Sequence, residues 1–73
     1  MNKQVVQELK FNGFDIVIQE VEGKEYFEVN LFDNSTGTDY VRYPKKGVDL
    51  GAYLTKEIKL ISKLRGFAPK KAN

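Results

Sequence analysis

Apolar and polar residues alternate in short runs over the first two thirds of the chain, and turn residues separate the runs. This two-residue period is typical of β-strands that bury one face. It predicts strands over residues 5–11, 14–21, 25–32 and 38–43. The intervening turns are Asn12-Gly13, Glu22-Gly23 and the loop 33–37, and Asn-Gly is the strongest hairpin signal among them.

The period lengthens after Pro44, which cannot donate a hydrogen bond to a strand ladder. Apolar residues then recur at helical spacing, at Leu50, Leu54, Ile58, Ile61 and Leu64. Asp49 stands where an N-cap belongs, and Gly66 where a helix typically ends. The pattern predicts one helix of about 16 residues and about 24 Å.

The predicted fold is therefore α+β, a four-stranded antiparallel β-meander followed by one C-terminal helix, in a single domain over residues 1–67. Because one helix covers only one face of a sheet, we expect the other face to be open. The residues assigned to the open face are Val17, Gln19, Val21, Tyr26, Glu28, Asn30, Phe32, Tyr40 and Arg42. Val5, Leu9 and Phe11 are expected to share one side of the first strand, and residues 68–73 to form a flexible basic tail.

The size and composition of the chain limit the kinds of assembly and functional site that we expect. A chain of 73 residues buries a thin core, so self-association into a homodimer is expected. With no cysteine and no histidine, we expect no catalytic activity, no cofactor and no metal. The loop 33–39 lacks the ligand spacing of a calcium site, and single glycines form no phosphate-binding motif. Apolar runs are far shorter than the roughly 20 residues of a membrane helix, so an intracellular protein without membrane contact is predicted.

Charge is segregated along the sequence. Residues 1–39 hold three bases and eight acids, a net charge of −5, whereas residues 40–73 hold nine bases and two acids, a net charge of +7. This asymmetry favours a polyanionic partner, or acidic and basic halves that meet across a dimer. Lys45-Lys46, beside Arg42, is either a phosphate contact or a solubilising turn. Lysines of the helix are interpreted as a solvated face.

The order of elements and turns resembles the positive cofactor four family of single-stranded DNA binders and transcriptional coactivators. The resemblance covers residues 7–64 and rests on the turn 21–24, the strand 26–32, the loop to Gly37, and Lys45-Lys46-Gly47-Val48-Asp49-Leu50 before the helix. It implies a dimer built through helices and last strands, with paired channels for single strands or melted duplex. The short chain suits a bacteriophage-encoded member.

The chain departs from the family at three binding positions. Val21 replaces a stacking aromatic, Glu22 a turn lysine and Asn30 a basic residue, so Phe32 or Tyr26 is expected to take over stacking. The expected DNA contacts are Lys10, Gln19, Lys24, Tyr26, Asn30, Phe32, Tyr40, Arg42, Lys45 and Lys46. The expected dimer interface is Leu54, Ile58, Ile61 and Leu64.

Together these features predict a non-catalytic protein that binds single-stranded DNA by stacking and phosphate contacts, with little sequence preference. The processes expected are replication, recombination or transcription, with proteins of those processes as further partners. The alternative is a protein-interaction module, such as an inhibitor of a nucleic-acid enzyme whose acidic strands mimic DNA. Salt-dependent binding to an oligonucleotide separates the two.

Overall fold

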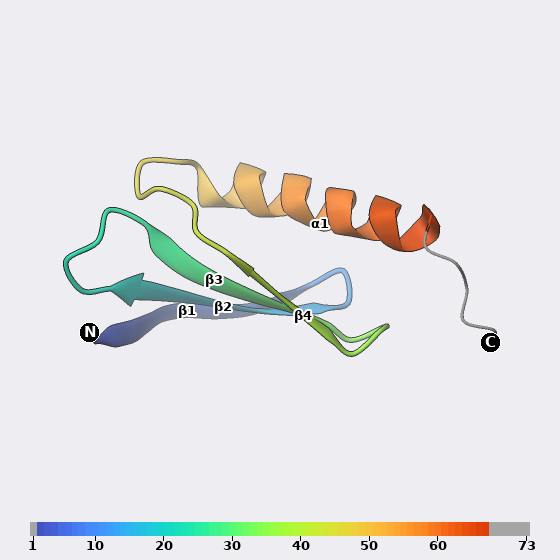
Figure 1. Cartoon of the computed structure of the whole chain (residues 1–73), viewed down its shortest axis with the longest axis horizontal. Coiled ribbons are helices and arrows are strands. Elements are labelled where there is room, and N and C mark those ends of the chain that lie inside the picture. The colour runs from blue at the N-terminus through green and yellow to red at the C-terminus, as the bar shows by residue number, and fades with distance from the viewer. Residues whose placement is uncertain (1, 68–73) are drawn as a thin grey trace.

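The computed structural model describes residues 2–67, and of residues 65–67 only the backbone. It confirms the predicted fold: β1 (Lys3–Phe11), β2 (Phe14–Val21), β3 (Phe27–Asp33) and β4 (Thr38–Arg42) form one antiparallel sheet, and α1 (Leu50–Phe67) follows. The helix runs along one face of the sheet and leaves the other uncovered (Figure 1). The predicted tail, residues 68–73, lies outside the described residues.

The first hairpin is set by its two turn residues. Asn12 and Gly13 both have positive φ, 49° and 82°, as a two-residue hairpin turn with right-handed twist requires. At the same end of the sheet, the loop after β3 is held by Asp33, whose buried carboxylate accepts a hydrogen bond from the Ser35 amide at 2.9 Å. Local turn chemistry thus holds the two hairpin connections at this end of the sheet.

The core lies between the sheet and α1. Every second residue of β2 and β3 enters it, and the helix adds one stripe; the buried residues are Phe14, Ile16, Ile18, Val29, Leu31, Leu54, Ile58 and Ile61. Each fully buried aliphatic side chain contributes about 1.5–3 kcal/mol. Among the described residues, no helix is long and apolar enough to span a membrane.

Strand β1 corrects one expectation from the sequence. Its pairing with β2 shifts between Val5 and Gln7, so Val5 lies opposite Gln19 on the open face, while Leu9 lies opposite Ile16 on the helix face. A single extra residue in one strand reverses the side-chain alternation beyond it. Val5 therefore does not share a side with Leu9 and Phe11.

Strand β4 corrects a second expectation. Tyr40 pairs with Leu31 and Arg42 with Val29, and both partners are buried under the helix. Tyr40 and Arg42 therefore face the helix, not the open side. The residue of β4 that lies on the open face between them is Val41, which is exposed.

The helix begins where the sequence predicts. The Asp49 carboxylate accepts a hydrogen bond from the Ala52 amide at 3.2 Å, the contact of an N-cap. The helix continues through Gly66 to Phe67, beyond the predicted end. Leu64 is 60% exposed, because it is rotated by about 60° from Ile61 at about 100° per residue.

Candidate nucleic-acid interface

The open face of the sheet carries every second residue of each strand, on the side away from α1 (Figure 1). Tyr26 and Tyr43 extend the rows of β3 and β4 beyond the strand ends. The residues of this face are Lys3, Val5, Glu8, Lys10, Asp15, Val17, Gln19, Val21, Tyr26, Glu28, Asn30, Phe32, Asp39, Val41 and Tyr43. The strand register thus confirms the open-face placement of Val17, Gln19, Val21, Tyr26, Glu28, Asn30 and Phe32.

At one end of this face two tyrosines meet. The ring centroids of Tyr26 and Tyr43 are 5.5 Å apart with an interplanar angle of 81°, an edge-to-face pair. Together with Lys3, Val21 and Glu28 they line a hollow of about 480 Å³. We call these five residues the Tyr26–Tyr43 hollow. Val21 is only 5% exposed although it lies on the open face, consistent with a place at the base of the hollow.

Of the two lysines at the Tyr26–Tyr43 hollow, one is in an ion pair and the other, within the part of the chain that the structure describes, is not. The Lys3 ammonium lies 3.0 Å from a Glu28 carboxylate oxygen, and this hydrogen-bonded contact raises the pKa of Lys3. Lys45 is paired with Tyr26 through an isolated antiparallel bridge, so the two side chains are neighbours. Lys45 is exposed, and among the described residues it takes part in no ion pair. It supplies a free cation beside two aromatic rings.

The other end of the open face is acidic. Phe32, 37% exposed, lies opposite Asp15 on β2 and Asp39 on β4. Lys10 on β1 pairs with Asp15, and its ammonium is 3.9 Å from the carboxylate. We call Phe32, Asp15 and Asp39 the Phe32 end. A phosphate group is repelled there by two carboxylates, of which one is compensated only by a long, exposed ion pair.

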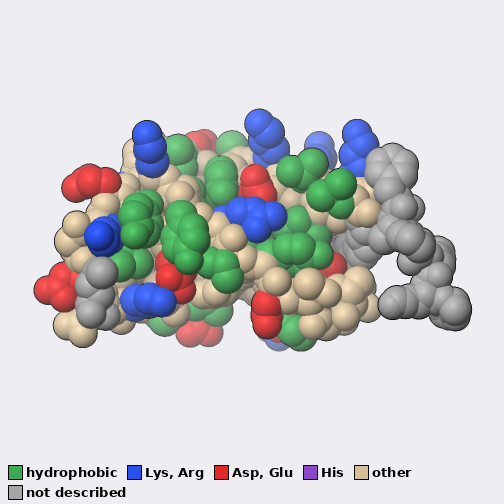
Figure 2. All heavy atoms as spheres, viewed as in Figure 1, with side chains coloured by type: hydrophobic (Ala, Val, Ile, Leu, Met, Phe, Trp, Pro, Cys, Tyr) green, Lys and Arg blue, Asp and Glu red, His purple; other side chains and the backbone are tan. Residues whose placement is uncertain are grey.

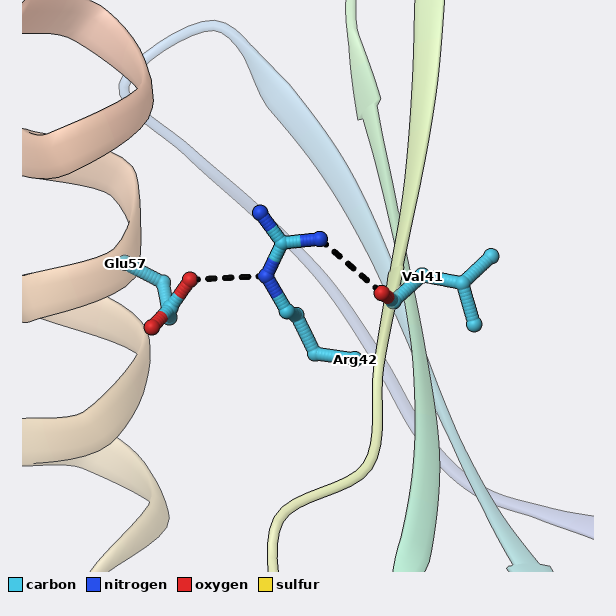
Figure 3. Close-up of polar contacts among 3 residues, drawn as sticks. All are labelled: Val41, Arg42 and Glu57. Atoms are coloured by element: carbon cyan, nitrogen blue, oxygen red, sulfur yellow. Dashed lines mark hydrogen bonds and ion pairs between the residues drawn. The ribbon is translucent and has the colours of Figure 1, made fainter.

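Arg42 is not available on the open face, because it joins the sheet to the helix. Its Nε donates to Glu57 Oε1 at 2.8 Å and its Nη1 donates to the Val41 carbonyl at 2.9 Å (Figure 3). The guanidinium also lies 5.8 Å from the ring centroid of Tyr40. Both expected DNA contacts on β4 are therefore part of the packing between β4 and α1.

The expected lysine pair is divided between the two sides of the sheet. Lys46 donates to Glu20 at 2.8 Å and lies 5.8 Å from the ring centroid of Phe27, on the helix face. Lys45 remains exposed on the other side. The two lysines therefore lie on opposite sides of the sheet, and only Lys46 has an ion-pair partner among the described residues.

Three further expected contacts are half-buried. Gln19 and Asn30 lie in the middle of the open face, half-buried, between its two ends. Lys24 lies in the turn between β2 and β3, half-buried, and its amide donates to the Val21 carbonyl at 3.1 Å. The structure thus brings Tyr26, Lys45 and Lys24 to one end of the sheet.

The expected dimer stripe lies largely inside the chain. Leu54, Ile58 and Ile61 are 2–6% exposed and pack on the sheet of the same molecule. They are not free to meet a second copy. Leu64 and its neighbour Leu60 are exposed, at 60% and 47%.

Of the five residues of the Tyr26–Tyr43 hollow, only Tyr26 was among the expected DNA contacts. Val21 and Glu28 were expected on the open face but not as contacts, and Tyr43 and Lys3 were in neither set. Tyr43 belongs to the open face because the register of the last hairpin continues past Arg42 to the Tyr26–Lys45 bridge. Counting alternation backward from Lys45 finds it. Lys3 carried no signal in the sequence, because its place follows from the shifted pairing of β1.

Among the described residues, no group of three or more histidine, cysteine, aspartate or glutamate side chains is placed to hold a metal ion. Comparisons of the chain with family models, curated proteins and solved structures find no match.

Proposed function

We propose that the protein is a non-catalytic, intracellular module that binds single-stranded DNA in replication, recombination or transcription. The observation that carries the proposal is the Tyr26–Tyr43 hollow, two aromatic rings on an uncovered sheet face beside the free cation Lys45. Exposed rings on a sheet are a recurrent platform for unpaired bases, because every base offers a π-face. An adjacent lysine neutralises the phosphate that follows the stacked base.

The two ends of the open face are proposed to differ in their use. Stacking is favoured at the Tyr26–Tyr43 hollow, where Lys45 lies beside the rings. It is disfavoured at the Phe32 end, where Asp15 and Asp39 flank the ring. Phe32, one of the two rings that the sequence predicts for stacking, provides the matched control.

The stacking arm of the test uses fluorescence anisotropy with a labelled single-stranded oligonucleotide. Tyr43→Ala removes a ring that is 57% exposed, so the fold is retained. We expect a loss of about 1–3 kcal/mol in affinity, which is roughly 5- to 150-fold. Phe32→Ala is expected to change affinity far less. Equal affinities for wild type and Tyr43→Ala contradict the proposal.

The charge arm compares two adjacent lysines. Lys45→Gln removes the free cation, and the slope of log affinity against log salt is expected to fall by about 0.7. Lys46→Gln removes a cation already paired with Glu20 and is expected to leave the slope unchanged. The reverse order of effects places the phosphate on the helix side and contradicts the proposal.

A specific observation favours a second candidate, a protein-interaction module. Phe32 between Asp15 and Asp39 is an exposed apolar anchor with an acidic rim. Such a surface fits a basic partner segment, as expected of an inhibitor that mimics DNA. Absence of binding to any oligonucleotide at low salt selects this candidate over the first.

We also propose that the protein is a homodimer. Leu60 and Leu64 follow Glu57 by three and seven residues, so they share the side of α1 that meets β4. Two exposed leucines beside an unpaired edge strand are a surface that a second copy covers. Light scattering is expected to give twice the chain mass of 8.4 kDa. A monomer at micromolar concentration contradicts this.

A further inference from the structure

The outer face of α1 carries three lysines in a row. Lys56, Lys59 and Lys63 are exposed, and lie opposite the buried stripe that includes Ile58 and Ile61. We call these three lysines the helix ridge. Lys and Arg side chains project along the helix-bearing edge of the molecule in Figure 2.

The helix ridge differs from most of the other described cations in forming no ion pair. Four cations of the sheet side form ion pairs, Lys3–Glu28, Lys10–Asp15, Lys46–Glu20 and Arg42–Glu57, whereas Lys24 and Lys45 form none among the described residues. Within residues 2–64, none of the three ridge lysines takes part in an ion pair. Glu57, the one acid of α1, is turned toward Arg42. The three charges of the helix ridge are thus not neutralised by an ion pair within residues 2–64.

We propose that the helix ridge binds the phosphate backbone of a nucleic-acid strand, on the surface opposite the open face. This goes beyond the function proposed above, because it needs no base stacking and no residue of the sheet. The three ammonium groups rise by about 10.5 Å along the helix at 1.5 Å per residue. A row of this length contacts several successive phosphates, and the contact carries no sequence preference.

The packing of α1 favours nucleic acid over a lipid surface. A basic helix binds a bilayer by burying an apolar face between the acyl chains while its cations meet the headgroups. Here the apolar stripe, with Leu54, Ile58 and Ile61, is buried against the sheet. The outer face of the helix carries ammonium groups on flexible lysine side chains, which can reach phosphate groups at variable positions.

The test uses the full chain with Lys56, Lys59 and Lys63 all replaced by glutamine. Because the three side chains are exposed, the melting temperature is expected to stay within a few degrees of wild type. With a labelled oligothymidylate of about 16 nucleotides, the salt slope is expected to fall by about 2, which is three contacts at about 0.7 each. The matched control replaces the same three lysines with arginine, which keeps the charge and is expected to keep the slope.

The outcomes separate this proposal from the function proposed above. Loss of slope in the triple glutamine variant, with Tyr43→Ala unaffected, supports the helix ridge and contradicts the stacking site. Loss of affinity in Tyr43→Ala, with an unchanged slope in the triple variant, overturns the helix ridge alone. Ridge-dependent binding to phosphatidylglycerol vesicles without binding to the oligonucleotide also overturns it.

Discussion

At the scale of single residues, neighbours in sequence have opposite roles in this protein. Lys45 and Lys46 leave the chain on different sides, one beside Tyr26 and the other bonded to Glu20. Arg42 likewise turns to Glu57 and leaves Val41 on the open face. Residue type alone therefore does not show which of these cations is available to a ligand. The strand register decides which of them already has a partner within the chain.

The Arg42–Glu57 contact is expected to stabilise the fold measurably. The two side chains are 34% and 16% exposed and 2.8 Å apart, between β4 and α1. We expect a double-mutant cycle of Arg42→Ala and Glu57→Ala to give a coupling of about 1 kcal/mol, at the upper end for partly exposed pairs. The free energies come from urea unfolding. Strict additivity of the two single variants contradicts the contact.

At the scale of elements, the ends of α1 and of the hairpins depend on a few polar side chains. The Asp49 carboxylate satisfies one amide of the first helical turn, and the Asn12-Gly13 turn sets the first hairpin. Both elements are predictable because the causes are local. Substitution of these capping and turn residues is expected to lower the free energy of unfolding and to leave ligand affinity unchanged.

Asp49→Ala is expected to reduce the free energy of unfolding by about 1 kcal/mol, because the N-cap hydrogen bond is lost. Urea unfolding with Asp39→Ala as the matched control measures it, since Asp39 is exposed and bonds no helix end. The control is expected to stay within about 0.5 kcal/mol. An equal effect of the two substitutions would show that the carboxylate does not cap α1.

Much of the fold follows from the sequence because strand and helix periods are local properties. The strands, the helix start at Asp49 and the faces of β2 and β3 were all predictable in this way. The face of β4 was not, because only Tyr40 and Val41 in this five-residue strand are apolar and they are adjacent, so neither orientation is favoured. The shift at β1 was not predictable either, since Val5 and Val6 are both apolar and each fits a buried position.

The candidate site could be predicted from the sequence only in part, because its residues are brought together by strand register. Tyr26 and Lys45 were identified by residue type and turn position, and the bridge between them confirms that they are neighbours. Their partners Tyr43 and Lys3 come from register, which joins residues far apart in the sequence, such as Tyr26 with Lys45 and Lys3 with Glu28. Long-range register of this kind is a tertiary property, and one inserted residue changes it.

At the scale of the whole molecule, charge and aromatic surface are separated. The open face has its rings at the Tyr26–Tyr43 hollow and at Phe32, with most of its lysines in ion pairs. Within the side chains that the structure describes, the lysines of the helix ridge have no ion-pair partner. The proposed contacts with nucleic acid are accordingly of two kinds, stacking on one side and phosphate neutralisation on the other.

Stability is expected to fall in alkali. Burial, with the nearby Glu57 carboxylate, raises the pKa of Tyr53 above its usual 10.0, and the Glu28 contact raises that of Lys3 above 10.5. In both cases the folded chain holds the proton more tightly than the unfolded chain, so the stabilisation is complete below the unfolded value and is lost as pH rises through the folded one.

The measurement is the melting temperature by circular dichroism on either side of this range, from neutral pH to above about 10. Tyr53→Phe is expected to reduce the alkaline loss, because the phenol that resists ionisation is removed. Tyr43→Phe is the matched control, since its ring is exposed. If Tyr53→Phe and wild type lose the same number of degrees, the phenol of Tyr53 does not contribute.

The most direct test of the stacking site is a two-dimensional amide NMR titration of the full chain with a single-stranded oligonucleotide. If single-stranded DNA stacks at the Tyr26–Tyr43 hollow, the largest shifts are expected on the backbone amides of Val21, Tyr26 and Tyr43, with those of Asp15 and Phe32 nearly unmoved. Largest shifts at Phe32 and Asp39, or no shifts on the sheet at all, would contradict the account.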